Sequence, residues 1–284
     1  MKKYLLPLLL LVGIATHAQN LEKALLWKIS GNSLSSSSYL YGTIHATCNF
    51  TIDENTSKAL KNTEQLYLEL DIDDPSLQTS MIVGISMKNG VTMNQLANEK
   101  DLAVLDQFLK DNIGVGVGVV SNFKPFFVSA MLLPKLLDCE IKSVESELMY
   151  LMAEQNESVF GIETVAEQMA VFDAIPYQEQ MNELVKTAKN NMVNDKKEFQ
   201  EILALYASKD ISGMLAASEA SENIISSKFK KELLTNRNQT WIPRMQKIML
   251  DKSTFFGVGA AHLAGENGVI QLLRKQGFKV EAVF

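Results

Sequence analysis

Short strand-like runs stand at the two ends of this chain, while segments with helical spacing fill its middle. The runs cover about 25–29, 39–44 and 66–72 at one end, and 255–260 and 278–283 at the other, with a helical segment at 269–276 between the last two. From about 75 to 250, apolar residues recur every three or four positions, which is typical of helices packed on a core. This pattern predicts an α/β fold whose central mixed sheet is built from N- and C-terminal strands around a large helical middle.

The length and composition suit one packed unit. The chain has 284 residues, of which 46% are hydrophobic and 21% charged, a balance that excludes a disordered, collagen-like or small disulfide-rich protein. We find no internal repeat and no low-complexity linker that would divide it. We therefore expect a single domain over 19–284.

Residues 1–18 have the three parts of a secretory signal peptide. Lys2 and Lys3 form a charged start, 5–14 form an apolar run, and a small-x-small site ends at Ala18. An uncleaved membrane anchor is the weaker alternative, because a span needs ~20 apolar residues. We expect cleavage near Ala18, a periplasmic or secreted protein, and no stable membrane anchor afterwards.

The cysteine content fits such a compartment without proving it. Cys48 and Cys139 are the two cysteines of the chain. An oxidising compartment permits a disulfide if their Cα atoms lie within about 7 Å. Two buried free thiols are the alternative, and the sequence gives no distance that would decide between them.

The charge balance argues against a nucleic-acid partner. The chain has 27 Lys and Arg against 33 Asp and Glu, a net charge of −6. Binding to a phosphate backbone requires the opposite sign. No pattern in the sequence fixes the oligomeric state.

Histidines are the rarest chemically versatile residues in the chain. His17 belongs to the signal segment, which leaves His45 and His262 in the mature protein. Each ends a Gly-x-x-His sequence, beginning at Gly42 and Gly259, and each follows an apolar strand-like run. Glycine permits a turn or a close backbone approach, and residues beyond the carboxyl ends of strands line ligand sites in α/β sheets. The alternative is that both are structural histidines with satisfied partners.

Two glutamates are candidates for the same site. Glu69 lies near the carboxyl end of the apolar strand 66–72, where an unpaired carboxylate would be costly. Glu163 precedes a helix whose start is marked by Thr164 and Glu167, a pair with capping-box spacing. A solvated loop position is the alternative for Glu163.

Two histidines with one or two glutamates form a ligand set for a divalent cation. Such a set suits Zn²⁺, Mn²⁺ or Co²⁺. We predict that His45, His262 and Glu69 hold the metal. The residues are spread over the chain, so no short motif establishes the site.

The ordered set of motifs resembles the TraB/GumN family over almost the whole mature chain. This family includes the Tiki proteins, described as metal-dependent proteases, and is considered a distant relative of erythromycin esterases and ChaN-like proteins. The residues that carry the resemblance are Leu26-Trp27-Lys28-Ile29, Tyr39-Leu40-Tyr41-Gly42-Thr43-Ile44-His45, Tyr67-Leu68-Glu69-Leu70-Asp71, Lys124-Pro125-Phe126, Gly161-Ile162-Glu163-Thr164 with Gln168, Arg237-Asn238, and Gly259-Ala260-Ala261-His262-Leu263 with Gly265 and Gly268.

The resemblance implies a duplicated α/β core with both Gly-x-x-His sequences and the acidic residues gathered at one site. It adds Arg237 and Asn238, which match a polar pair on a late helix expected over 235–250. Arg237 either points into the site or forms an ion pair at the surface. The sequence departs from the family at Val144-Glu145, where many relatives have Gly/Leu-Asp, so we leave Glu145 out of the predicted site.

These residues predict a metal-dependent hydrolase, similar to a peptidase, that acts on a peptide or protein. The metal would polarise the carbonyl and lower the pKa of a bound water, while Glu69 or Glu163 accepts the proton. A metal-free hydrolase is the alternative, with a histidine as general base and Arg237 stabilising the oxyanion. The second alternative is a non-catalytic protein of the same fold that binds a peptide or another ligand. No Gly-x-Ser-x-Gly sequence supports a serine hydrolase, and the glycine-rich segment 114–120 lacks a nucleotide-binding fingerprint.

Overall fold

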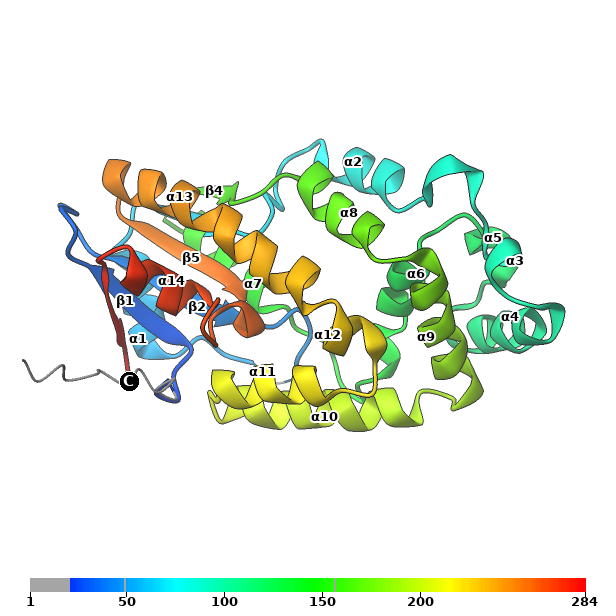
Figure 1. Ribbon diagram of the computed structural model, residues 1–284. Coiled ribbons are helices and arrows are strands. Elements are labelled where there is room, and N and C mark those ends of the chain that lie inside the picture. The colour runs from blue at the N-terminus through cyan, green and yellow to red at the C-terminus, as the bar shows by residue number, and fades with distance from the viewer. Residues whose placement is uncertain (1–20, 49, 156) are drawn as a thin grey trace, which may run out of the picture.

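One mixed six-stranded sheet forms one end of the molecule, and helices extend away from it (Figure 1). The computed structural model describes residues 21–48, 50–155 and 157–284. The predicted signal peptide, 1–18, lies outside these residues. The strands are β1 (Leu26–Ser30), β2 (Ser38–Thr43), β3 (Gln65–Leu68), β4 (Ser158–Gly161), β5 (Thr254–Gly259) and β6 (Lys279–Ala282).

The strand order in the sheet is β4-β3-β5-β2-β1-β6. β5 pairs in parallel with both β2 and β3, and β3 pairs in parallel with β4. β1 pairs antiparallel with β2, as a hairpin, and with β6. The predicted α/β class and the joining of N- and C-terminal strands in one mixed sheet are confirmed.

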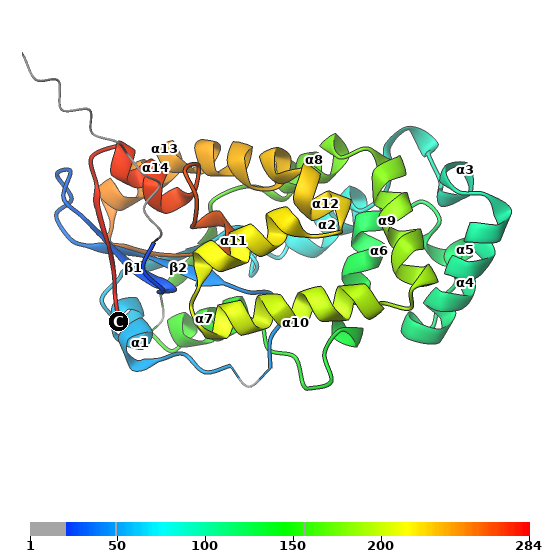
Figure 2. The ribbon, with the colours of Figure 1, turned by 60° about the horizontal axis from the view of Figure 1, so that its bottom comes forward.

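Fourteen α-helices are described over 21–48, 50–155 and 157–284, and most of them lie in the middle of the chain. They are α1 (Glu54–Lys61), α2 (Leu77–Gly84), α3 (Met93–Leu96), α4 (Glu99–Ile113), α5 (Val117–Val120), α6 (Pro125–Met131), α7 (Val144–Ala153), α8 (Val165–Ala174), α9 (Tyr177–Lys189), α10 (Val193–Ala207), α11 (Ile211–Ala220), α12 (Ile224–Lys228), α13 (Asn236–Asp251) and α14 (Val269–Lys275). Figures 1 and 2 both place α3, α4 and α5 at the end of the molecule opposite the sheet.

The strand expected over 66–72 is shorter in the structure. β3 ends at Leu68, so Glu69 is the first residue beyond it. The segment 71–75 contains three aspartates and a proline, residues that favour turns over extended pairing. The capping box predicted at the start of α8 is present, with the Thr164 and Glu167 side chains each accepting a hydrogen bond from the other's backbone N–H.

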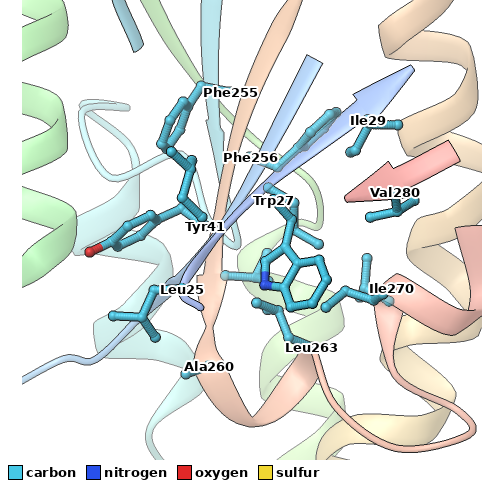
Figure 3. Packing of buried hydrophobic residues seen from close by; sticks show 14 of the residues in the cluster. Leu25, Trp27, Ile29, Tyr41, Phe255, Phe256, Ala260, Leu263, Ile270 and Val280 are labelled. Carbon is cyan, nitrogen blue, oxygen red and sulfur yellow. The ribbon is translucent and has the colours of Figure 1, made fainter. Parts of the chain in front are cut away.

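The main apolar core lies on the sheet and under the helices that cover it. The central strand β5 contributes Phe255 and Phe256, which are completely buried. Figure 3 shows Phe255 beside Tyr41 on one side of β5, and Phe256 on the other side, toward Trp27 of β1, with Ile270 of α14 facing the Trp27 ring. Each large side chain removed from water here contributes roughly 1.5–3 kcal/mol. This core fixes the positions of the strand ends.

A second apolar cluster lies in the helical part. It is formed by buried residues between Met87 and Met192, including Leu105 and Leu109 of α4 and Leu184 of α9. The two clusters are separate sets of buried residues. The molecule therefore has one core on the sheet and another among helices far from it.

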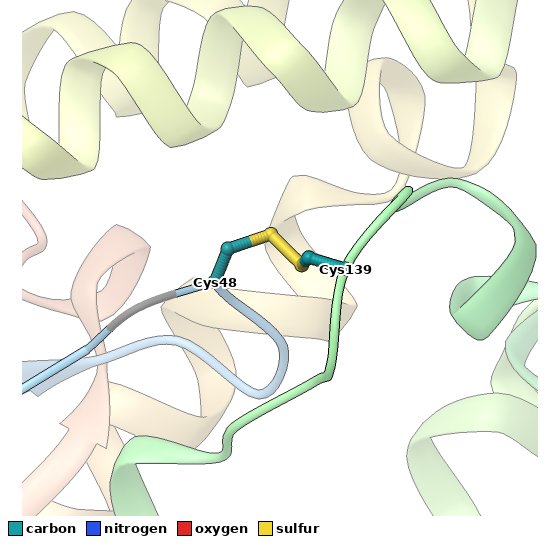
Figure 4. The surroundings of a disulfide bond; sticks show 2 residues. All are labelled: Cys48 and Cys139. Atoms are coloured by element: carbon teal, nitrogen blue, oxygen red, sulfur yellow. A yellow bond between two sulfur atoms is a disulfide. The ribbon is translucent and has the colours of Figure 1, made fainter.

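The cysteines form a disulfide, which settles the alternative that the sequence left open. Cys48 and Cys139 have Cα atoms 6.0 Å apart and join two loops that are 91 residues apart in the chain (Figure 4). Backbone hydrogen bonds between Thr47 and Lys142 run beside the bridge. The loop after β2 is thus fixed to the segment before α7.

Candidate active site

The candidate residues of the site follow four neighbouring strands that run in the same direction. His45 follows β2, Glu69 follows β3, Glu163 follows β4 and His262 follows β5. Because β2, β5, β3 and β4 are parallel neighbours, their carboxyl ends lie at one edge of the sheet. This is the edge at which open α/β sheets bind ligands.

The glycines of the two Gly-x-x-His sequences allow close backbone approaches. A Cβ atom on Gly42 would lie 3.1 Å from the Cβ atom of Ala260, so the first Gly-x-x-His sequence packs directly on the second. A Cβ atom on Gly259 would lie 3.3 Å from Oε1 of Glu69. The backbone N–H of Gly259 donates to this oxygen at 2.8 Å. Both glycines therefore keep the strand ends close to the glutamate.

Arg237 lies at the centre of the cluster, in the first turn of α13. Its Nη2 donates to Oε1 of Glu163 at 2.6 Å and also contacts Oε2 of Glu69. Its Nε lies 3.2 and 3.3 Å from the two oxygens of Glu163. The Arg237 side chain is only 11% exposed. Of the two orientations left open by the sequence, the structure has the one in which Arg237 points into the site.

A π-helical turn, Lys231–Thr235, precedes α13 and accepts a further bond from Arg237. Nη1 donates to the carbonyl oxygen of Leu233 at 3.1 Å. The plane of the guanidinium also lies against Trp241, one turn further along α13, at 4.8 Å from the ring centroid. π-Helical turns are rare in proteins, and those that occur are often found at functional sites. Backbone, aromatic ring and carboxylates together fix the guanidinium.

Hydrogen bonds determine the tautomer of His262. Nη1 of Arg237 lies 3.1 Å from Nε2 of His262 and can only donate, so Nε2 carries a lone pair. Nδ1 then carries the proton and donates to Oδ1 of Asn238 at 2.6 Å. The amide of Asn238 cannot be reversed, because its Nδ2 donates to the carbonyl oxygens of His262 and Asn267 at 3.2 and 2.8 Å.

Burial keeps this imidazole neutral. His262 is 3% exposed, and its removal from water, with the charge of Arg237 nearby, lowers its pKa to about 3 despite the opposing charge of Glu69. The Trp241 ring lies 4.5 Å from the His262 ring, centroid to centroid. His262 therefore presents a fixed, neutral Nε2 toward the centre of the cluster.

The two glutamates share Arg237 as a partner but differ in their other hydrogen-bond donors. Burial alone would raise the pKa of Glu69, but the charge of Arg237 and the Gly259 N–H bond contribute to lowering it to about 2. Glu163 accepts hydrogen bonds from Nε1 of Trp241 at 3.0 Å and from Nε2 of Gln168 at 3.2 Å. Glu163 is 7% exposed and is not a solvated loop acid.

His45 differs from His262 in its surroundings. Its side chain is 71% exposed, and its Nδ1 lies 2.8 Å from Oε1 of Glu145, at the start of α7. The contact with Glu145 raises the pKa of His45 above its usual value. Within the described residues, its ion pair is to Glu145 rather than to Glu69. His45 therefore carries a positive charge at the rim of the site.

Glu145 is the residue that the sequence reasoning set aside. It is 6% exposed and accepts a bond from Oγ of Ser143 at 2.7 Å besides contacting His45. Burial raises the pKa of Glu145, but the contacts with His45 and Ser143 outweigh that and lower it. The sequence signal that could have identified Glu145 is a serine two positions earlier, at the start of a helix. The partner histidine, 100 positions earlier, could not be found from spacing.

The predicted metal ligands do not form a cation site in this arrangement. Nε2 of His262 and Oε1 of Glu69 are 3.8 Å apart, close enough to share one ion. Arg237, however, contacts both side chains, and His45 pairs with Glu145. No three His, Cys, Asp or Glu side chains in 21–48, 50–155 and 157–284 are placed to hold a metal. A cation would have to replace the guanidinium between the two donors.

A family model and curated relatives match this chain. The model of the TraB/PrgY/gumN family matches residues 25–282, which is nearly the whole described chain. The chain belongs to the TraB/PrgY/gumN family. No solved structure matches it.

The matching curated relatives are metalloproteases of animals. The chain is 22% identical to metalloprotease TIKI1 of Danio rerio, with 86% of this chain and 60% of the relative covered. It is 23% identical to metalloprotease TIKI2 of Xenopus tropicalis (86% and 57%) and 21% identical to metalloprotease TIKI1 of Homo sapiens (86% and 59%). The chain thus spans less than two thirds of these relatives and is distantly related to them. None of the described helices is both long enough and apolar enough to span a bilayer.

Proposed function

We propose that this member of the family is a hydrolase that cleaves peptide bonds by direct attack of water. The observation that carries the proposal is the neutral Nε2 of His262, fixed by Asn238 and directed at a cluster of charged groups. A lone pair on an oriented imidazole is the usual acceptor for the proton of an attacking water. The distant relationship to the TIKI metalloproteases supports a peptide substrate.

In the proposed reaction, the Nη1–H of Arg237 that donates to Nε2 of His262 first turns to the carbonyl oxygen. The freed Nε2 then accepts a proton from water while the water oxygen attacks the carbonyl carbon. The low pKa of His262 makes it a weak base in the resting arrangement, because an imidazolium there lies beside Arg237. Negative charge on the carbonyl oxygen would compensate Arg237 as the proton moves. Glu69, 3.8 Å from Nε2, would stabilise the imidazolium that forms.

Arg237 is proposed to stabilise the oxyanion, and Glu163 to hold Arg237 in place. The guanidinium is buried and held by two carboxylates, and all five of its N–H groups have partners, so the N–H that reaches the oxyanion is the one released from His262. Asn238 is a positioning residue, since it acts through His262. Protonated His262 can then return its proton to the leaving amine.

The metal-dependent form of the reaction stays a separate proposal. In it, His45, His262 and Glu69 would hold Mn²⁺, Co²⁺ or Zn²⁺, which would polarise the carbonyl and activate water, and Glu163 or Glu69 would accept the proton. That form requires Arg237 to leave Nε2 of His262 and His45 to lose its proton. The metal-free form also needs Arg237 to leave Nε2, but it leaves the His45–Glu145 pair intact, and we derive no step through a metal.

We also propose that the protein works in the periplasm or outside the cell. The signal-like residues 1–18 support this location, and so does the pairing of Cys48 with Cys139, since disulfides persist in oxidising compartments.

The experiment that tests the function is cleavage of an unfolded protein, followed by mass spectrometry of the products. Purified chain and reduced, alkylated casein are incubated with and without a strong chelator, beside elemental analysis of the enzyme. We expect cleavage that survives chelation and is lost in His262→Asn. Cleavage that requires a bound, near-stoichiometric metal would support the metal-dependent form instead. No cleavage with or without added Mn²⁺, Co²⁺ or Zn²⁺ would favour a binding protein.

A further inference from the structure

A cavity of about 830 Å³ adjoins the candidate site, and the reaction proposed above does not use most of it. Its walls come from the segments after β3 and β4, the start of α8, and α2. Glu163 lines the cavity and also binds Arg237, so the cavity adjoins the site at this residue. Its volume is in the range of pockets that bind small molecules or side chains.

One wall of the cavity is an apolar helix that packs poorly on the rest of the protein. None of the eight residues of α2 is buried, although four of them are Leu, Met, Ile and Val. Val83 lines the cavity and is 75% exposed, and Leu77 lines it one and a half turns earlier. Exposed apolar surface beside a cleft marks a binding surface. α2 packs against α8, yet its Ile82 and Val83 side chains remain 61% and 75% exposed.

Another wall is the edge of the sheet. β4 is the terminal strand, and among the described residues its ladder partner is β3 alone. Phe160 of β4 lines the cavity and is 36% exposed. The outer backbone groups of an edge strand can pair with an extended peptide, which lines up alternate side chains with neighbouring pockets.

The charged side chains that line the cavity are mostly acidic. Asp71, Asp74 and Glu163 line it, and so does Arg244. Glu163 is paired with Arg237 and Arg244 with Glu167, which leaves Asp71 and Asp74 without a basic partner among the described residues. Oδ1 of Asp71 is buried and has no hydrogen-bond partner among the described residues. An unpaired buried acceptor is costly unless a ligand supplies a donor. The charge therefore complements a basic group.

We propose that this cavity binds an extended peptide segment along β4, with a large apolar side chain against α2 and a basic side chain facing Asp71 and Asp74. The inference rests on the proposed function in one respect: the backbone of the bound segment must pass Glu163 to reach His262 and Arg237. It assigns the substrate class as polypeptide in which apolar and basic residues adjoin. Acidic segments are excluded by the same carboxylates.

The test is binding of two labelled peptides, measured by fluorescence anisotropy. The probes are ten-residue peptides with two central leucines, flanked by lysines in one and by glutamates in its twin, and mass spectrometry after each titration checks that they remain intact. Val83→Asp introduces a charge at the cavity wall. Ile82→Asp is the matched control, because Ile82 is the preceding residue of α2, is 61% exposed and is not among the residues that line the cavity.

We expect the lysine peptide to bind the wild-type chain at least tenfold more tightly than its twin. Val83→Asp should weaken that binding roughly tenfold and Ile82→Asp less than twofold, while Asp74→Asn should reduce the preference for lysine. Equal Kd values for Val83→Asp and Ile82→Asp, equal binding of the twins, or no binding of either peptide would overturn the inference. Binding does not depend on turnover, so absent cleavage with the expected binding pattern defeats only the proposed function, and cleavage without that pattern defeats only this inference.

Discussion

Two histidines with the same sequence context have opposite electrostatic states. His262 is buried beside Arg237, which keeps it neutral, whereas His45 is exposed beside Glu145, which favours its charged form. The difference comes from the partners and not from the Gly-x-x-His sequences themselves. The two residues therefore have separate roles, one at the reacting centre and one at its rim.

NMR titration of the two imidazoles tests this difference directly. We expect the His262 ring to show no titration above about pH 5, because its pKa is lowered to about 3. The His45 ring should titrate above the usual value of 6.5 and return toward it in Glu145→Gln, which removes the negative partner. The two imidazole signals are assigned with the variant His262→Asn, which lacks the signal of His262. Two rings that titrate together near 6.5 would contradict the assigned tautomer and contacts.

Replacing Arg237 should destabilise the protein, because two buried carboxylates lose their positive partner. For Arg237→Gln we expect a loss of about 3–5 kcal/mol in unfolding free energy at pH 7. The control is Arg244→Gln on the same helix, whose more exposed pair with Glu167 should contribute at most about 1 kcal/mol.

The same variant should respond less steeply to acid than the wild type. In the wild type, the pKa of Glu69 falls from 4.5 to about 2 on folding, so its contribution is complete above pH 4.5 and is lost as pH falls toward 2. Without Arg237, burial raises the pKa of Glu69, so acid no longer removes a contribution from this group, and the variant should lose less stability than the wild type on acidification. Urea unfolding at pH 3.5 and pH 6 measures the difference. Parallel losses in both proteins on acidification would contradict this account.

At the scale of elements, the disulfide connects the two segments that supply His45 and Glu145. Cys48 lies three residues after His45, and Cys139 lies six before Glu145. Closing a loop of 91 residues stabilises the folded state by about 4–5 kcal/mol in the chain-entropy model. The bridge therefore acts on both stability and the rim of the site.

Reduction should lower the unfolding free energy by about this amount. It should also bring the pKa of His45 closer to its usual value, because the Glu145 segment is held less firmly. Denaturant unfolding and NMR titration with and without a thiol reductant measure both effects. The variant with Cys48→Ser and Cys139→Ser should show them without reductant and should not respond to it. A reductant effect of equal size in that variant would show that the bridge is not responsible.

At the scale of the whole molecule, a buried lysine joins the helical part to the wall of the cavity. Lys124 is 1% exposed, and its Nζ donates to the carbonyl oxygen of Gly84, the last residue of α2, at 2.6 Å. It also pairs with Asp173 of α8 at 3.0 Å. One charge thus connects α2, α8 and the start of α6.

Lys124→Met should loosen this junction while leaving the sheet intact. We expect a loss of about 2 kcal/mol, smaller than for an isolated buried pair because Lys88 still pairs with Asp173 at 2.9 Å. Hydrogen exchange should accelerate at the amides of α2 and α8 and stay unchanged in β5. Equal acceleration of hydrogen exchange in α2, α8 and β5 would contradict this view.

Much of the fold followed from periodicity, because strands and helices differ in spacing and the two ends had to share a sheet. The meeting of Glu69, Glu163 and His262 was also predictable, since parallel strands bring their carboxyl ends together. The inward direction of Arg237 was not, because it depends on how α13 is rotated against the sheet. Pairings across long separations, His45 with Glu145 and Cys48 with Cys139, leave no spacing signal. The motif that contains Lys124 was noted, but its burial depends on Asp173, 49 positions later.

The central claim is that His262, held by Asn238, activates water for peptide hydrolysis. Its most direct test is the rate of cleavage of a quenched fluorescent lysine–leucine peptide by the wild type, Asn238→Leu and His262→Asn, each confirmed as folded by circular dichroism. The account predicts a fall in kcat of at least about a hundredfold in both variants, since a positioned base contributes about 10²–10⁴-fold. If His262→Asn cleaves the peptide at the rate of the wild type, the account is contradicted.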